Sequence, residues 1–295
     1  MRIPFSLSWR PFREAKFSLL FLALLIPVVF FIFFLIGFFV SFPDTVLQNR
    51  LVTEINRLLP AGNSFEADAV TFGLPLRLQI DQARLTLAHS PLPELQLSRV
   101  RLSPTLATLI GRPGLAIQAE SAFGALDGSL HLSGEVDLHL REGAFNFPLA
   151  GMPNLQLEGM IKAVDLVGQM QLNKDEPMQL QALVDNLLLR GADQLGLGQT
   201  ELVLGTLSLQ LAGSGRSQQI EQLSLSGGVV TVNGGGKIVV QQPIAASGLD
   251  LKLNLKPEAS ANSGLRTMLD LLGPAGNDGA HQIQLRGRLF APQLK

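Results

Sequence analysis

The stretch LDGSLHLSGEVDLHL, residues 126–140, decides the fold class of this chain. Every second position from Leu126 carries an apolar side chain or a glycine, and the positions between carry Asp, Ser, His or Glu. Side chains of a β-strand point alternately to the two faces of a sheet, so this period of two predicts a strand with one apolar and one polar face. We expect the run to form one long strand.

The same period of two extends to both sides, from Phe65 to Leu289. The alternating segments are short and are separated by clusters of Gly, Asn, Asp and Pro, which is typical of an antiparallel meander. Two segments with helical spacing interrupt it, at residues 104–110 and 264–272. The sequence therefore predicts a mainly β domain, a curved antiparallel meander sheet with a few short covering helices.

The N-terminal part has a different composition. No charged residue occurs from Phe17 to Phe42, and about 20 apolar residues suffice for a helix to span a bilayer. Basic residues precede this run and Asp44 follows it, so the positive-inside rule places the N-terminus in the cytoplasm. The expected division of the chain is a cytoplasmic basic segment (1–16), a transmembrane helix (17–42), an amphipathic helix with a connector (43–62) and one exported antiparallel β domain (63–295).

The apolar face of such a sheet must be covered, and the sequence leaves two possibilities open. Either the sheet folds on itself as a sandwich or barrel and the face is ordinary core, or it curls into an open trough that contacts acyl chains or another apolar partner. The candidate lining residues of such a groove are Leu130, Leu132, Val136, Leu138, Leu140, Leu251 and Leu253.

The composition argues against several other functions. With a net charge of −1 and 16% charged residues, the chain does not resemble a nucleic-acid-binding protein. It has no cysteine, which excludes disulfides and thiolate metal sites. His131 and His139 share the polar side of the run, but eight residues of extended strand separate them by roughly 26 Å. We therefore expect no metal site, no cofactor and no enzymatic activity.

Three stretches carry a resemblance to a known family: FGLPLRL at 72–78, IEQLSLSGG at 220–228, and the ending that runs from Leu272-Gly273-Pro274 to Pro292. With the preceding anchor, they resemble the type II secretion system protein N family in its AsmA-like, deltaproteobacterial form. The resemblance implies a single-pass protein of the bacterial inner membrane with a periplasmic β domain, accessory to the type II protein secretion system through interaction or assembly.

The resemblance also implies the competing function. AsmA-like relatives form amphipathic troughs associated with lipid transport, so the alternative is a lipid-binding or lipid-transfer protein acting between the inner and outer membranes. The partners expected from the resemblance are inner-membrane lipid, other subunits of the secretion system and a lipid in the groove.

Overall fold

The computed structural model describes residues 44–59, 62–73, 76–86, 94–105, 107–108, 111–149, 152–169, 175–241, 246–289 and 291–294. The predicted cytoplasmic segment 1–16 and transmembrane helix 17–42 lie outside these residues. Among the residues described, no helix combines the length and the apolarity that crossing a membrane requires.

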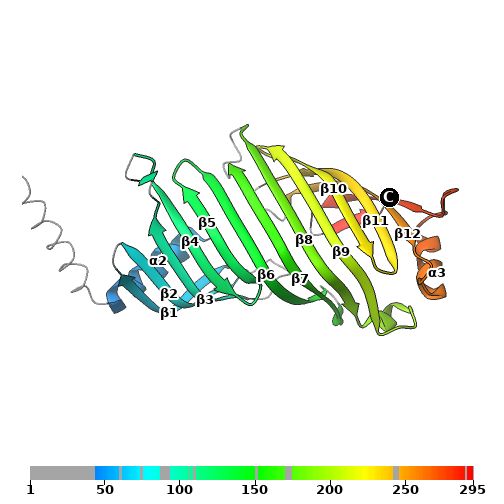
Figure 1. Ribbon diagram of the computed structural model, residues 1–295, viewed down its shortest axis with the longest axis horizontal. Helices are drawn as coiled ribbons and strands as arrows, with labels where there is room; N and C mark the ends of the chain where they lie inside the picture. The colour runs from blue at the N-terminus through cyan, green and yellow to red at the C-terminus, as the bar shows by residue number, and fades with distance from the viewer. Residues whose placement is uncertain are drawn as a thin grey trace, which may run out of the picture.

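The described strands form a single antiparallel sheet of fourteen strands, each paired with its neighbours in the sequence (Figure 1). The strands are β1 Ser64–Gly73, β2 Arg77–Thr86, β3 Leu95–Pro104, β4 Gly114–Ser121, β5 Gly124–His131, β6 Glu135–Leu149, β7 Met152–Gln169, β8 Pro177–Arg190, β9 Glu201–Ser214, β10 Ser217–Gly227, β11 Val230–Val239, β12 Gly248–Pro257, β13 His281–Arg288 and β14 Ala291–Leu294. The predicted mainly β, antiparallel meander is confirmed.

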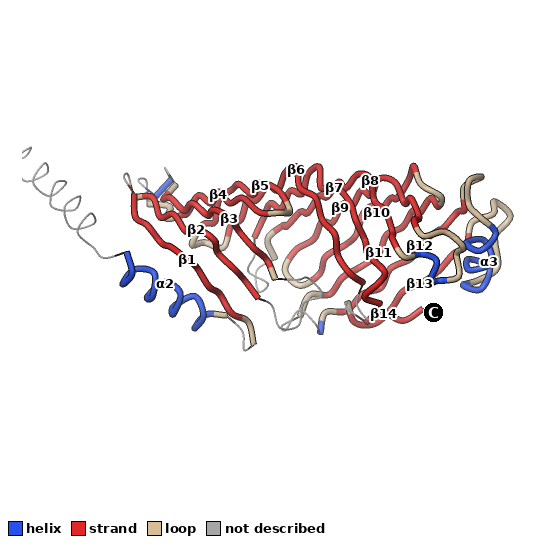
Figure 2. The backbone as a smooth tube through the Cα atoms, turned by 90° about the horizontal axis from the view of Figure 1, so that it is seen from below, coloured by secondary structure: helices blue, strands red, loops and turns tan. Residues whose placement is uncertain are grey.

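The sheet is curved (Figure 2), and β1 and β14 are its two edges. Figure 2 shows β4 to β8 along one side of the molecule and β13 and β14 along the other. Every described strand belongs to this one sheet, so two separate packed sheets are not found in the described part of the chain.

Helix α2 (Asp44–Leu58) lies against β1, at one end of the sheet. The Asn56 amide Nδ2 donates to the Phe65 carbonyl oxygen at 2.8 Å, and Asn56 Oδ1 accepts from the Phe65 N–H at 2.7 Å. Gln48 Nε2 donates to the Ala67 carbonyl oxygen at 2.7 Å. These amides occupy backbone groups at the edge of β1 that a further strand would otherwise use. The helix expected within residues 43–62 is confirmed.

Helix α3 (Ser263–Leu272) lies at the opposite end of the molecule (Figure 1). Asn262 caps it, with its side-chain oxygen accepting from the Leu265 N–H at 2.8 Å. Leu265 and Leu269 are buried. The helix expected at 264–272 is therefore confirmed. A single turn of 3-10 helix, η2 (Ala192–Leu195), lies in the loop between β8 and β9.

Two predictions of local structure are wrong. A helix was expected at 104–110, but Pro104 is the last residue of β3 and does not begin a helix. Of the described residues in that range, only 107–108 are helical, and they form a short 3-10 turn. The run 126–140 is a hairpin and not one strand: β5 ends at His131 and β6 begins at Glu135. Gly134, with φ 91°, lies in a left-handed conformation that glycine adopts without strain, and its N–H donates to the His131 carbonyl oxygen at 2.8 Å.

Candidate functional site

The strand register aligns apolar residues into rows that cross the sheet. Opposed residues of an antiparallel pair lie on the same face, so each row can be followed from strand to strand. The first row, from β6 to β13, is Leu138, Leu166, Leu180, Leu211, Ile220, Gly236, Leu251 and Leu285. The second row is Leu140, Val164, Ala182, Leu209, Leu223, Gly234, Leu253 and Ile283.

The rows unite candidate residues from distant parts of the sequence. Leu138 and Leu251 belong to the first row, and Leu140 and Leu253 to the second, although the two members of each pair lie more than a hundred positions apart in the sequence. We call the face that carries both rows the apolar face.

The remaining candidates lie on β5 and β6 or between them. Leu130 of β5 opposes Val136 of β6 on the apolar face, and Val136 is fully buried. Leu132 is the exception, because it lies in the turn between the two strands with 79% of its surface exposed. Its predicted place in the lining is therefore wrong: the turn at Gly134 removes it from the strand.

Two separate hydrophobic clusters cover parts of the apolar face. The α2 cluster includes Phe65, Val70 and Ile80, and apolar side chains of α2 pack against it. The α3 cluster includes Leu265 and Leu269 of α3 together with side chains of β6 to β12. Its row of opposed residues, next to the second row, is Val184, Leu207, Leu225, Val232 and Leu255. The face is thus closed at the α2 end and along the α3 side.

Between these clusters lies a set of apolar residues on β6 to β9 that belongs to neither. We call this set the central patch: Leu138, Leu140, Val164, Leu166, Leu180, Ala182, Leu209 and Leu211. All eight side chains are partly exposed, whereas the leading residues of both clusters are buried. Within the described residues, the middle of the apolar face is therefore less covered than its surroundings.

Sequence reasoning missed the β7 to β9 members of the central patch. The alternation at 178–184 and 207–211 was visible and predicted strands, but alternation does not say which residues oppose one another. It also missed Gln218, a polar residue that opposes Gly213 and Ile238 and is only 2% exposed. Its Nε2 donates to the Gly215 carbonyl oxygen at 3.1 Å, which holds the amide against the turn between β9 and β10.

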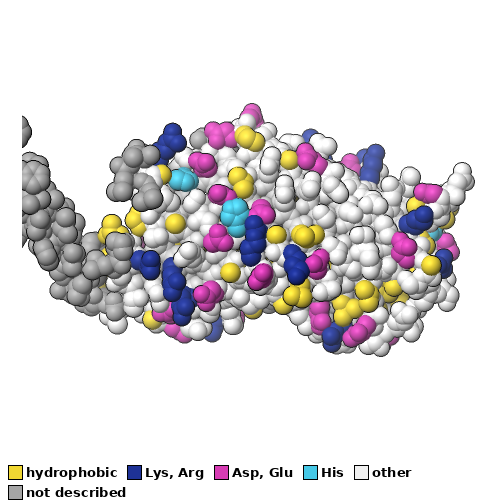
Figure 3. Space-filling model, viewed as in Figure 1, with side chains coloured by type: hydrophobic (Ala, Val, Ile, Leu, Met, Phe, Trp, Pro, Cys, Tyr) yellow, Lys and Arg dark blue, Asp and Glu magenta, His cyan; other side chains and the backbone are white. Residues whose placement is uncertain are grey.

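The other face of the sheet is polar. Figure 3 shows charged side chains scattered over the face seen in Figure 1, with hydrophobic ones only in small groups. The alternation that puts Leu138 and Leu140 on the apolar face puts Asp137, His139 and Arg141 on the polar one. Function on this face would have to come from polar side chains.

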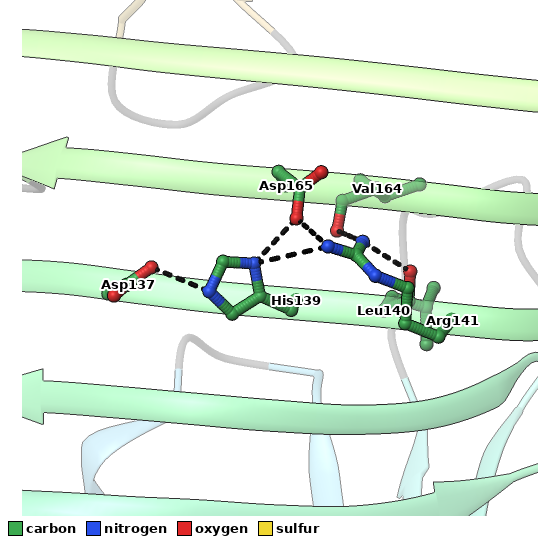
Figure 4. A network of polar contacts seen from close by, with 6 residues as sticks. All are labelled: Asp137, His139, Leu140, Arg141, Val164 and Asp165. Atoms are coloured by element: carbon green, nitrogen blue, oxygen red, sulfur yellow. Dashed lines mark hydrogen bonds and ion pairs between the residues drawn. The ribbon is translucent and has the colours of Figure 1, made fainter.

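A network around His139 joins β6 to β7 on the polar face (Figure 4). His139 Nδ1 lies 2.5 Å from Asp165 Oδ1, its Nε2 lies 3.0 Å from Asp137 Oδ1, and Arg141 also binds Asp165. The hydrogen bond to Asp165 and the charge of Asp137 raise the pKa of His139. Bonds from Arg141 and His139 lower the pKa of Asp165. Each member of the network has its partner within the network, so these contacts stabilise the pairing of β6 with β7.

The hairpin also changes the relation of the two histidines. The separation of roughly 26 Å expected for His131 and His139 assumed a straight strand, and it is wrong because the chain turns between them. In the described ranges, no three His, Asp or Glu side chains gather in a way that could hold a metal ion.

The fold and the site define a class of protein: a single curved antiparallel sheet with one polar and one apolar face, the latter partly covered by helices at its ends. No protein family model, no curated protein and no solved structure matches the chain.

Proposed function

We propose that this protein binds the acyl chains of membrane lipids along the apolar face, with the curved sheet acting as an amphipathic trough. The observation that carries the proposal is the central patch, eight aligned apolar side chains that neither hydrophobic cluster covers. Contiguous apolar surfaces of this kind on proteins mark sites where a ligand or a partner binds.

The chemistry of the rows favours acyl chains. Both rows consist of Leu, Ile, Val, Ala and Gly, so they offer no side-chain hydrogen bond and no aromatic ring. A methylene chain needs neither, and burying it contributes roughly 0.8 kcal/mol per CH₂. Extraction from a bilayer costs a similar amount per CH₂, so transfer between bilayer and trough is nearly balanced and reversible.

The dimensions are also sufficient. From β6 to β9 the central patch crosses three strand spacings, roughly 14 Å at ~4.8 Å each. One leaflet of a bilayer holds its acyl chains within about 15 Å, half of a hydrocarbon core of ~30 Å. The central patch is therefore about as wide as one lipid tail is long, when the tail lies across the strands.

Single cysteines test this proposal directly, because the chain has none of its own. In full-length protein stripped of lipid, a maleimide should label Leu180→Cys in the central patch, and added lipid should protect it. Leu269→Cys, at a position 1% exposed in the α3 cluster, should stay unlabelled in both states. Lys252→Cys, on the polar face, should be labelled in both. Labelling of Leu180→Cys that lipid does not change would refute the proposal.

The location in the cell is part of the proposal. The uncharged run from Phe17 to Phe42 and the basic residues before it support an anchor in the bacterial inner membrane, with residues from 43 onward in the periplasm. A reporter fused after Lys295 should be active only as an exported enzyme, and cytoplasmic activity of the fusion would contradict this topology. The accessory role in type II secretion stays a prediction that rests on the resemblance alone.

A further inference from the structure

Charged residues are distributed unevenly along the sheet. Strands β1 to β8 carry seven basic and eleven acidic residues. Strands β11 to β14 carry five basic residues and one acidic residue, Asp250. Strands β1 to β8 together thus carry an excess of negative charge, and the far end of the sheet is basic.

The five basic residues of the far end form one surface on the polar face, which we call the basic face: Lys237, Lys252, Lys256, Arg286 and Arg288. The register brings them together, because Lys237 and Arg286 both oppose Asp250, one from each neighbouring strand. All five side chains are exposed. They spread over three adjacent strands and point away from the apolar face.

Most of this positive charge is not neutralised within the protein. In β1 to β8, four of the seven basic residues form ion pairs with acidic side chains. On the basic face Arg286 pairs with Asp250 at 3.0 Å. Within the described ranges, no carboxylate lies within ion-pair distance of the other four. The basic face therefore has free cationic groups for an external anion.

We propose that the basic face docks on an anionic lipid surface. The inference rests on the proposed function, because a lipid carrier held in one membrane needs a second lipid surface with which to exchange. The positions fit: β12 lies eleven strand spacings from β1, roughly 53 Å measured along the sheet at ~4.8 Å each. Figure 1 shows α2 and β12 near opposite ends of the molecule.

The composition of the basic face favours lipid headgroups over a protein partner. The side chains between the cations are short polar ones, Asn233, Asn254, Gln282 and Gln284, with no aromatic residue among them. Protein interfaces depend on a few buried aromatic or arginine anchors that fill pockets. A layer of phosphate groups needs only positive charge spread over a surface. Each lysine near such a layer raises the affinity about five-fold.

The test uses the full chain held in nanodiscs of neutral phosphatidylcholine. Vesicles of phosphatidylcholine and phosphatidylglycerol in equal parts are added, and the fraction of nanodiscs that floats with them is measured. We expect wild-type nanodiscs to float with these vesicles, but not with vesicles of phosphatidylcholine alone, and high salt should release them. The double variant Lys252→Gln with Lys256→Gln should lower the partition coefficient about 25-fold.

A matched control removes two positive charges elsewhere. Arg77→Gln with Lys162→Gln changes the net charge equally, and both positions are exposed on β2 and β7. This control should stay within about two-fold of the wild type. Equal losses in both double variants would show dependence on net charge alone and overturn the proposal. Wild-type nanodiscs that fail to float, or a Lys252/Lys256 variant that floats normally, would also overturn it.

Native mass spectrometry separates this inference from the proposed function. The Lys252→Gln, Lys256→Gln variant should keep as much bound lipid as the wild type, because its substitutions face away from the central patch. Loss of that lipid would mean that the substitutions act on the trough, which also contradicts a separate docking surface. A wild-type protein that docks but never contains lipid would refute the trough and leave the docking surface standing.

Discussion

Replacing Leu138 by aspartate distinguishes an open trough from a closed core. Leu138 lies in the first row and is partly exposed. Burying a whole leucine side chain contributes about 1.5–3 kcal/mol, so the loss of a partly buried one costs about 1–2 kcal/mol. In an open trough, water reaches the new carboxylate, so its charge adds little to this loss of stability. Leu138→Asp should therefore fold and should lose its bound lipid.

Two matched substitutions bracket this result. Leu269 is 1% exposed in the α3 cluster. Its removal alone costs about 2–5 kcal/mol, and an unpaired buried carboxylate adds several more. Together these approach the whole stability of a typical domain, about 5–15 kcal/mol, so Leu269→Asp should not fold. Leu132→Asp, in the exposed turn, should change neither stability nor bound lipid.

The assay is urea unfolding of the full chain in detergent, followed by circular dichroism, with native mass spectrometry for bound lipid. From the most to the least stable, the expected order is Leu132→Asp, then Leu138→Asp, then Leu269→Asp. If Leu138→Asp unfolds as completely as Leu269→Asp, the apolar face is closed core and the reasoning from the central patch is refuted. If Leu138→Asp folds and keeps its lipid, the lipid binds elsewhere.

Three further predictions test the fold itself. A Cβ at Gly143 would lie 1.5 Å from the Phe123 carbonyl oxygen, so Gly143→Ala should lower the free energy of unfolding by more than about 2 kcal/mol. Gly248→Ala is the control, because the atom nearest to its added Cβ lies 4.0 Å away. It should have little effect in the same urea titration. The hydrogen bond to Asp165 and the charge of Asp137 raise the pKa of His139. The pairing of these carboxylates with the protonated imidazole stabilises the folded state below about pH 6.5, and this stabilisation is lost as the pH rises through the folded-state pKa. The wild-type melting temperature should fall from pH 6 to pH 8 relative to that of His139→Asn, and parallel profiles would contradict this. Asn56→Ala removes the amide pairing at the edge of β1, and hydrogen exchange there should accelerate about five- to ten-fold; unchanged exchange would mean that the edge is protected in another way.

Local pattern was sufficient to predict much of this architecture. The period of two predicted the strands because one face of each packs on apolar neighbours and the other meets water. The helices α2 and α3 were predictable because their apolar spacing is helical and because Gly273 and Pro274 follow α3. These features depend only on residues close together in the sequence.

The errors and omissions came from turns and strand pairing, which the alternation of apolar and polar residues does not show. Leu130 and Leu132 look equivalent in an alternating run, but the turn at Gly134 leaves only Leu130 on the apolar face. Ser103 and Pro104 have the chemistry of a helix start, yet Pro104 opposes Leu115 of β4 and extends β3. The central patch depends on the register of β6 to β9, which pairing across hairpins sets and which no single segment contains.

Each strand pairs only with its neighbours in the sequence, and different residues protect the two edges of the sheet. The number of strands between the edges can therefore change without changing either edge. At one edge the amides of Gln48 and Asn56 bind the backbone of β1, and at the other β14 has only four residues, one of them Pro292. Short, proline-containing edges discourage pairing with other chains. A hairpin inserted between two interior strands would lengthen the apolar face by two spacings, roughly 10 Å, without altering either edge. The length of the apolar face is therefore independent of the residues that protect the two edges of the sheet.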